Sequence, residues 1–182
     1  MRKRKLKINV TKANYHFKHM RRNNEEFNVS EDKCWELLQD FIPNSNFSKK
    51  MADYGRWKEK EYVDATGLTS DNQFINMELK KRNIAINQYP TLDAEGHKLA
   101  DLYIDYFCDK KIPLYINFLK DGYVVVFNLA KLKHRHSAKK EKNWSQGYHA
   151  FEMTQTQKLD IKDAWVYKKD KNNNYKLMQK GW

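Results

Sequence analysis

Residues 60–80 read KEYVDATGLTSDNQFINMELK and contain two strand-like runs on either side of a cluster of turn formers. Asp71 lies at the centre of that cluster, and an antiparallel hairpin folded about it places Ala65 opposite Met77. Because side chains alternate across a strand, this register gives the hairpin one apolar face, including Val63, and one polar face. The pattern predicts a half-buried β-sheet. Its two strands are expected at 60–66 and 74–80.

The polar face of this hairpin brings together two acids and a lysine. Asp64 lies opposite Glu78, and directly opposed residues have Cβ atoms about 4.5–5.5 Å apart. Two carboxylates at that separation repel each other unless a proton or a cation lies between them. Lys80 follows on the same face, where an ammonium could stabilise charge at phosphorus, orient a water or protonate a leaving oxygen. Carboxylates, a divalent ion and a lysine are the parts needed to hydrolyse a phosphodiester, although a surface ladder of ion pairs is the alternative.

The spacing of these residues resembles the PD-(D/E)XK motif of restriction-endonuclease-like nucleases, with thirteen residues between Asp64 and the Glu-Leu-Lys run that ends at Lys80. The expected order of helix, motif strands, helix and strands also resembles that family over residues 30–130. The resemblance implies an α/β fold in which helices flank a mixed β-sheet. It also implies a bound Mg²⁺ or Mn²⁺ and cleavage of DNA, with Asp64 and Glu78 as metal ligands and Lys80 as the catalytic lysine.

Two further residues are suggested by the same resemblance. Some members of the family add a catalytic acid from the first helix, and Glu36 matches it by placement, with a solvated helix residue as the alternative. Other members place a glutamine after the lysine strand, where Gln88 stands, although an ordinary loop residue is the simpler interpretation. Val63 departs from the pattern, because the motif that names the family has proline before its aspartate.

Elsewhere the chain alternates helical and strand-like patterns. A helix is expected at 30–42, with Cys34 and Leu38 on its apolar face, and a second helix at 94–109 with Leu99, Leu102 and Phe107 on its apolar face. Asp121-Gly122 between two apolar runs is a hairpin signal. The remaining expectations are a connection at 81–93, strands at 114–119, 123–129, 148–153 and 163–168, a basic loop at 131–142 and a polar turn at 170–174.

The net charge of +12 is concentrated toward the ends of the chain. Residues 1–22 contain nine Lys or Arg and no acid, residues 131–142 contain six basic residues and one acid, and the middle of the chain is acidic. Basic segments attract a polyanion, so contact with nucleic acid is expected, with a solvated surface as the alternative for any one segment. The candidate contact residues are Arg2, Lys3, Arg4, Lys5, Lys133, His134, Arg135, Lys139 and Lys140.

Composition narrows the class of protein. The chain is 40% hydrophobic and 14% aromatic, which is typical of a folded domain, and its apolar runs are too short to span a bilayer. Its two cysteines, Cys34 and Cys108, are expected to be buried thiols in a reducing cytoplasm. We expect a basic N-terminal arm at 1–27 and one nuclease-like domain at 28–182. The predicted function is metal-dependent cleavage of DNA, whether duplex, single-stranded or branched, or of RNA; the alternative is a nucleic-acid-binding or protein-interaction module without catalysis.

Overall fold

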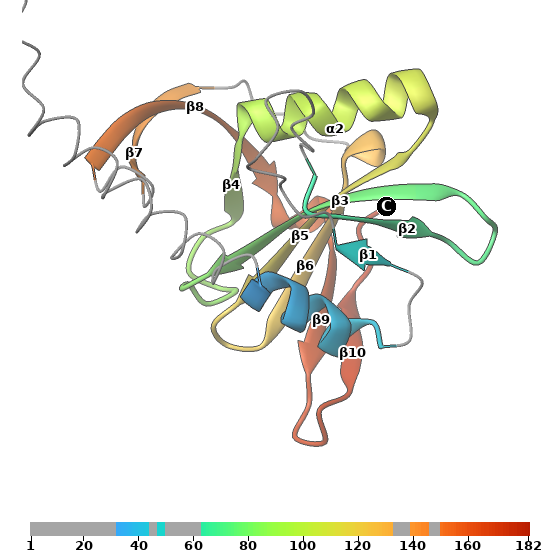
Figure 1. The fold of residues 1–182 in the computed structure, drawn as a ribbon. Helices are drawn as coiled ribbons and strands as arrows, with labels where there is room; N and C mark the ends of the chain where they lie inside the picture. Colours follow the sequence, from blue (N-terminus) through green and yellow to red (C-terminus); the bar gives the residue numbers. More distant parts are fainter. Residues whose placement is uncertain (1–31, 44–46, 50–62, 133–138, 146–149) are drawn as a thin grey trace, which may run out of the picture.

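The computed structural model describes residues 32–43, 47–49, 63–132, 139–145 and 150–182, with the backbone alone described for 49, 139–145 and 150–154. These residues form two β-sheets and two helices, and the helices lie on opposite sides of the larger sheet (Figure 1). The protein is therefore of the α/β class. Within the described ranges, no helix has both the length and the apolar character needed to cross a bilayer.

The larger sheet has seven strands in the order β1-β2-β3-β5-β6-β9-β10. The sheet is mixed, because β3 and β5 run parallel whereas the other neighbouring strands run antiparallel. Its strands are β1 (Ser48–Lys49), β2 (Ala65–Leu68), β3 (Phe74–Arg82), β5 (Ile112–Leu119), β6 (Tyr123–Asn128), β9 (Trp165–Lys169) and β10 (Tyr175–Gln179). The smaller sheet has the order β4-β8-β7, and its strands are β4 (Thr91–Glu95), β8 (Ala150–Asp160) and β7 (Lys139–Ser145).

The hairpin of β2 and β3 has the register that the sequence predicts. Ala65 pairs with Met77, and both side chains are completely buried. The first strand begins later than expected, because the chain bends at Asp64 and enters β2 only at Ala65. The prediction for Val63 was wrong: the bend takes this residue out of the strand alternation, and its side chain packs in the apolar cluster on the other side of the sheet.

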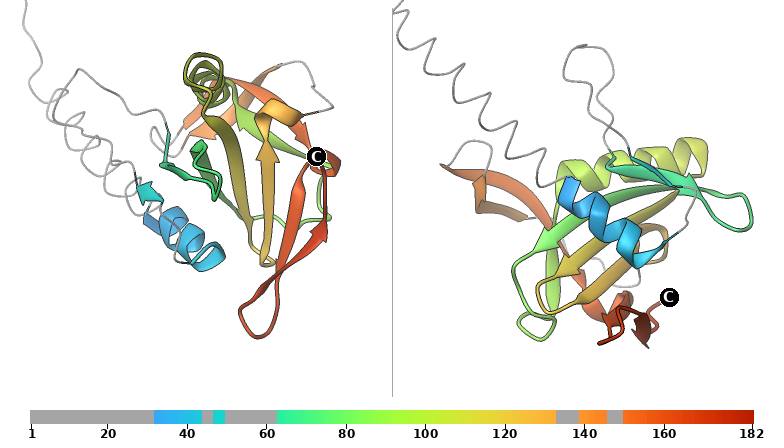
Figure 2. Two further views of the ribbon diagram at one scale, coloured as in Figure 1. Left: turned by 90° about the vertical axis from the view of Figure 1, so that its right-hand side faces the viewer. Right: turned by 60° about the horizontal axis from the view of Figure 1, so that its bottom comes forward.

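Two apolar clusters cover the two faces of the larger sheet. Their members alternate along the central strands, so that Tyr115 of β5 belongs to one cluster and Ile116 to the other. We call the first the α2-side core, since helix α2 (Gly96–Asp109) contributes Leu99 and Leu102 to it. The second, the opposite core, is covered by the helix at residues 32–41 (Figure 2). The sheet is thus buried on both faces.

Helix α2 belongs to the connection between the parallel strands β3 and β5. Parallel neighbours require a crossover of this kind, and here the crossover contains both β4 and α2. Leu99 and Leu102 are buried as predicted, but Phe107 is 65% exposed and Cys108 is also exposed. Both predictions of burial were wrong because these two residues lie well around the helix from the face that Leu99 and Leu102 define.

Three other expectations require correction. The segment 81–93, expected as a connection, contains the start of strand β4, and the expected basic loop at 131–142 contains the start of β7. The polar turn at 170–174 is confirmed, but β10 follows it unpredicted. A separate prediction, the hairpin turn at Asp121-Gly122, is confirmed. Gly122 has a φ of 78°, a value that a residue with a side chain rarely adopts. Strand β7 and the first part of β8 extend away from the larger sheet, whereas the end of β8 pairs with β4 (Figures 1 and 2).

Asp40 ties the helix at 32–41 to the last hairpin of the sheet. Its Oδ2 accepts hydrogen bonds from Lys169 Nζ at 2.7 Å and from the Tyr175 hydroxyl at 2.7 Å. These bonds lower the pKa of Asp40 below its ordinary value. Phe41 packs edge-on against the rings of Tyr167 and Tyr175, so a charged contact and an aromatic contact fix the end of this helix together.

Replacing Asp40 with asparagine should destabilise the protein by about 0.5–1 kcal/mol near neutral pH, because the bonds lie near the surface. The carboxylate has a depressed pKa, so its contribution is fully present above the ordinary value of 3.8 and is lost as the pH falls through the lower folded-state value. Urea unfolding of both proteins between neutral pH and about pH 3 measures the difference. Asp71→Asn, at an exposed turn, is the control. If the difference in unfolding free energy between the wild type and Asp40→Asn stayed the same at low pH, the carboxylate of Asp40 would not be the cause.

Candidate functional site

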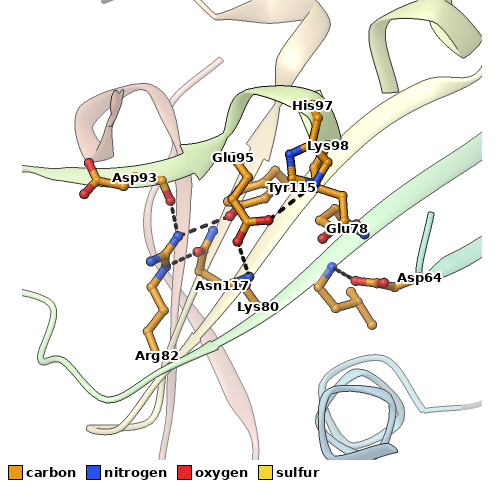
Figure 3. A network of polar contacts seen from close by, with 11 residues as sticks. Asp64, Glu78, Lys80, Arg82, Asp93, Glu95, His97, Lys98, Tyr115 and Asn117 are labelled. Atoms are coloured by element: carbon orange, nitrogen blue, oxygen red, sulfur yellow. Dashed lines mark hydrogen bonds and ion pairs between the residues drawn. The ribbon is translucent and has the colours of Figure 1, made fainter. Parts of the chain in front are cut away.

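A row of polar side chains crosses one face of strand β3. The alternating residues Glu78, Lys80 and Arg82 point to the face that carries the α2-side core. Strand β4 and helix α2 cross this face, and they bring Glu95 and Lys98 into contact with the row (Figure 3). The crossover between β3 and β5 therefore closes a polar site over the middle of the sheet.

Asp64 approaches the row from the bend before β2. Its backbone N–H donates to the carbonyl oxygen of Met77 at 3.0 Å, which extends the hairpin register by one residue. Its side-chain Oδ2 accepts a hydrogen bond from the backbone N–H of Leu79 at 2.7 Å. The carboxylate is thereby held beside β3, next to Glu78, and its negative charge acts on Glu78 and on Lys98.

Glu78 is a deeply buried acid, with only 5% of its side chain exposed. Burial, and then the charge of Asp64, raise the pKa of Glu78 to about 8 against the opposing charges of Lys98 and Lys80. Lys98 Nζ lies 3.3 Å from Glu78 Oε2, so the ionised form of Glu78 is paired with this lysine. The pair lowers the cost of burying this carboxylate but does not cancel it.

Lys80 and Glu95 form the second ion pair of the site, with 2.8 Å between Nζ and Oε1. Burial alone would lower the pKa of Lys80, but the charge of Glu95 and their hydrogen bond outweigh it, and the pKa lies above its ordinary value. Burial, the largest single influence, would likewise raise the pKa of Glu95, but the charge and hydrogen bond of Lys80 together with the charges of His97 and Lys98 outweigh burial, and the pKa is lowered. Each partner therefore keeps the other charged, and Lys80 carries its proton at neutral pH.

Arg82 fixes the strand that carries Glu95. Its Nε donates to Asn117 Oδ1 at 2.6 Å, and one terminal nitrogen donates to the Tyr115 hydroxyl at 3.1 Å and to the backbone carbonyl of Asp93. Asp93 lies two residues before Glu95 on β4. The guanidinium therefore joins β3, β4 and β5, and this determines where Glu95 meets Lys80.

The structure brings three of the four predicted catalytic residues together. Glu78 and Lys80 lie on the α2 side of β3, and Asp64 reaches the edge of β3 at the backbone N–H of Leu79, which lies between them in sequence. Glu36 is not part of this group: it is exposed, it pairs with Lys33 at 3.0 Å, and its helix packs on the other face of the sheet. Gln88 is an exposed residue of a turn, where its amide bonds Tyr89 and the backbone of Ala85.

The predicted nucleic-acid contacts fall almost entirely outside the described residues. Strand β7 places the backbone of Lys139 and Lys140 in the smaller sheet, in a register opposite Thr156 and Gln155, and their side chains are not described. The candidates that lie outside the described ranges are Arg2, Lys3, Arg4, Lys5, Lys133, His134 and Arg135.

Sequence reasoning missed Glu95, Lys98 and Arg82. One signal was available, because Lys98 lies one turn before the buried Leu102 and next to Leu99, a position where a lysine is unusual. Arg82 continues the alternation of Lys80, but the strand was expected to end at residue 80. Glu95 gave no signal, since an acid just before a helix is common as a capping residue.

Asp64 and Glu78 provide the hard oxygen donors that Mg²⁺ and Mn²⁺ prefer. The raised pKa of Glu78 is consistent with a cation site, because burial leaves its negative charge incompletely compensated. Within the described ranges, no group of three or more His, Cys, Asp or Glu side chains is arranged to hold a metal ion. The two carboxylates fit an ion that takes its remaining ligands from water and substrate, as Mg²⁺ commonly does.

Comparisons with protein-family models, with curated proteins and with solved structures found no match to this chain. A functional proposal therefore rests on the geometry and the electrostatics of the site. The fold bears on it only by bringing these side chains together.

In the absence of metal, Glu78→Gln should be more stable than the wild type, by an amount that grows between about pH 5 and pH 9. Wild-type stability falls in this interval, because the unfolded state ionises Glu78 near the ordinary value of 4.5 and the folded state only near 8. Glutamine stays neutral and avoids this loss. Chemical unfolding in the presence of a chelator measures the difference, and Glu36→Gln controls for the removal of one carboxylate. If the difference in unfolding free energy between Glu78→Gln and the wild type did not change with pH, the folded state would not raise the pKa of Glu78.

Proposed function

We propose that this protein is a metal-dependent nuclease that hydrolyses phosphodiester bonds, with DNA as the expected substrate. The observation that carries the proposal is the pair of carboxylates, Asp64 at the edge of β3 and Glu78 on it, with the protonated Lys80 two residues beyond Glu78. The like charges favour a cation at this point, and the ammonium favours a bound phosphate. A purely structural ladder would not be expected to place the two carboxylates Asp64 and Glu78 side by side.

The fold supports a restriction-endonuclease-like core. The helix at 32–41 precedes the antiparallel hairpin β2–β3, and α2 precedes β5, which pairs in parallel with β3. This order is the one that the motif around Asp64 and Lys80 led us to expect. The proposal extends to a basic arm at residues 1–27.

The residues of the site would divide the chemistry between them. Asp64 and Glu78 would hold Mg²⁺ or Mn²⁺, which when bound polarises a phosphate oxygen and lowers the pKa of water. Lys80, kept charged by Glu95, stabilises the negative charge that develops on the phosphate. A cation at Glu78 competes with Lys98 for the same carboxylate, which leaves the Lys98 ammonium available to a second phosphate oxygen.

The alternative function is a nucleic-acid-binding or protein-interaction module that has this fold but no catalytic activity. The two ion pairs, Lys80 with Glu95 and Lys98 with Glu78, favour it, because they neutralise much of the site without any metal ion. This alternative predicts neither metal-dependent cleavage nor stabilisation by metal.

Lys80→Ala should slow metal-dependent cleavage about 10²–10³-fold, as expected for the loss of one pre-oriented charge at the phosphate. Lys81→Ala is the matched control, because Lys81 is exposed on the adjacent, opposite-facing position of β3, and it should cleave like the wild type. The assay uses duplex, single-stranded and branched DNA and RNA with Mg²⁺ or Mn²⁺, and again with a chelator. If the wild type cleaves none of them and neither metal raises its melting temperature, the binding module is the better description.

We also propose that the basic segments at 1–22 and 131–142, and the segment 158–180 with its seven Lys and three Asp, contact the nucleic-acid backbone with little sequence preference. Each phosphate neutralised on duplex DNA contributes about −0.9 to the slope of log K against log salt. Deleting residues 1–22 should therefore flatten that slope. Binding titrations at several salt concentrations measure it, and an equal slope for the full and shortened chains would exclude phosphate contacts by the arm.

A further inference from the structure

Hydrolysis of a phosphodiester requires a proton for the oxygen that leaves phosphorus. Both lysines of the site already donate to carboxylates: Lys80 Nζ to Glu95 at 2.8 Å and Lys98 Nζ to Glu78 at 3.3 Å. These bonds suit the lysines for holding charge in place. Another side chain is therefore needed to donate the proton to the leaving oxygen.

His97 lies beside this site at its solvent-exposed side. It is the second residue of α2, and 63% of its side chain is exposed, so a substrate can reach its imidazole. Its Nε2 lies 3.7 Å from Glu95 Oε2, while the other oxygen of Glu95 binds Lys80. One carboxylate thus connects the histidine to the row on β3, as Figure 3 shows.

Both negative and positive groups surround the imidazole of His97. Glu95 and Asp101, one turn further along α2, attract a protonated imidazole. The neighbouring Lys98 and the positive end of the helix oppose it. Imidazole is the commonest general acid of enzymes because it can both donate and accept a proton, which a lysine ammonium bound to a carboxylate does less readily.

We propose that His97 is the general acid of the reaction, and this inference rests on the proposed nuclease function. A water oxygen forms a bond to phosphorus and loses one proton to solvent. The bond from phosphorus to the leaving oxygen breaks, and that oxygen takes the proton from His97. The imidazole then regains a proton from solvent, so the net reaction consumes one water. Glu95 is the positioning residue, because it orients the imidazole and Lys80 from its two oxygens.

The test compares an oxygen with a sulfur leaving group. His97→Gln should cleave ordinary DNA about 10²-fold or more slowly than the wild type, the contribution expected of general acid catalysis. A DNA strand with one bridging sulfur in place of the leaving oxygen, at a mapped cleavage position, releases a thiolate that needs no proton. The variant should cleave this strand at nearly the wild-type rate. Equal losses on both strands, or no loss on either, would overturn the assignment.

Two binding measurements separate this role from a structural one. Calorimetry with Mn²⁺ and titration with DNA in the presence of a chelator should give the same affinities for His97→Gln and the wild type. Ile104→Gln, at another exposed position of α2, is the control and should cleave both strands normally. A wild type that cleaves neither strand and binds no Mn²⁺ rejects the nuclease function itself. A wild type that cleaves, with a His97→Gln variant that binds Mn²⁺ more weakly, rejects only the proton-donor role.

Discussion

The parallel pairing of β3 with β5 is the constraint on which the site depends. A simple meander would leave one face of the β2–β3 hairpin open to water, and Glu78 would be an ordinary surface acid. Parallel neighbours need a long connection, and this connection carries β4 and α2 across that face. The crossover buries Glu78 and supplies Lys98 and Glu95 at the same time. Topology, more than the hairpin itself, makes the site electrostatically unusual.

The two faces of β3 show how the fold accommodates this burial. Residues on one face, such as Met77, fill the opposite core, whereas those on the other form a polar row through the α2-side core. Charges within an apolar layer are costly unless each has a partner. Here the partners come from the crossover, and Arg82 attaches that crossover to the sheet through Asn117, Tyr115 and the backbone of β4. The contacts that stabilise the crossover are therefore the ones that position the polar site.

Local patterns predicted what is local in this fold. The β2–β3 register, the buried face of α2 and the Asp121-Gly122 turn all follow from spacing within a few residues. The position of Val63 did not, because a single bend at Asp64 inverts the alternation. Strand β4 was missed because it is short and its partner, β8, is distant in sequence. The partners Glu95 and Lys98 were missed for the same reason, since the crossover that brings them to β3 leaves no periodicity.

The placement of acids follows from the same geometry. The resemblance to nucleases suggested an acid from the first helix, but that helix packs on the opposite core through Cys34 and Leu38. An acid on it would have to pass through the sheet to meet Glu78. Among the described residues, Glu95 at the end of β4 is an acid on the α2 side of the sheet. Because this acid comes from the crossover, it stands directly before α2 and places His97 within reach of the same carboxylate. Glu95 and the exposed His97 beside it are thus a joint consequence of one connection.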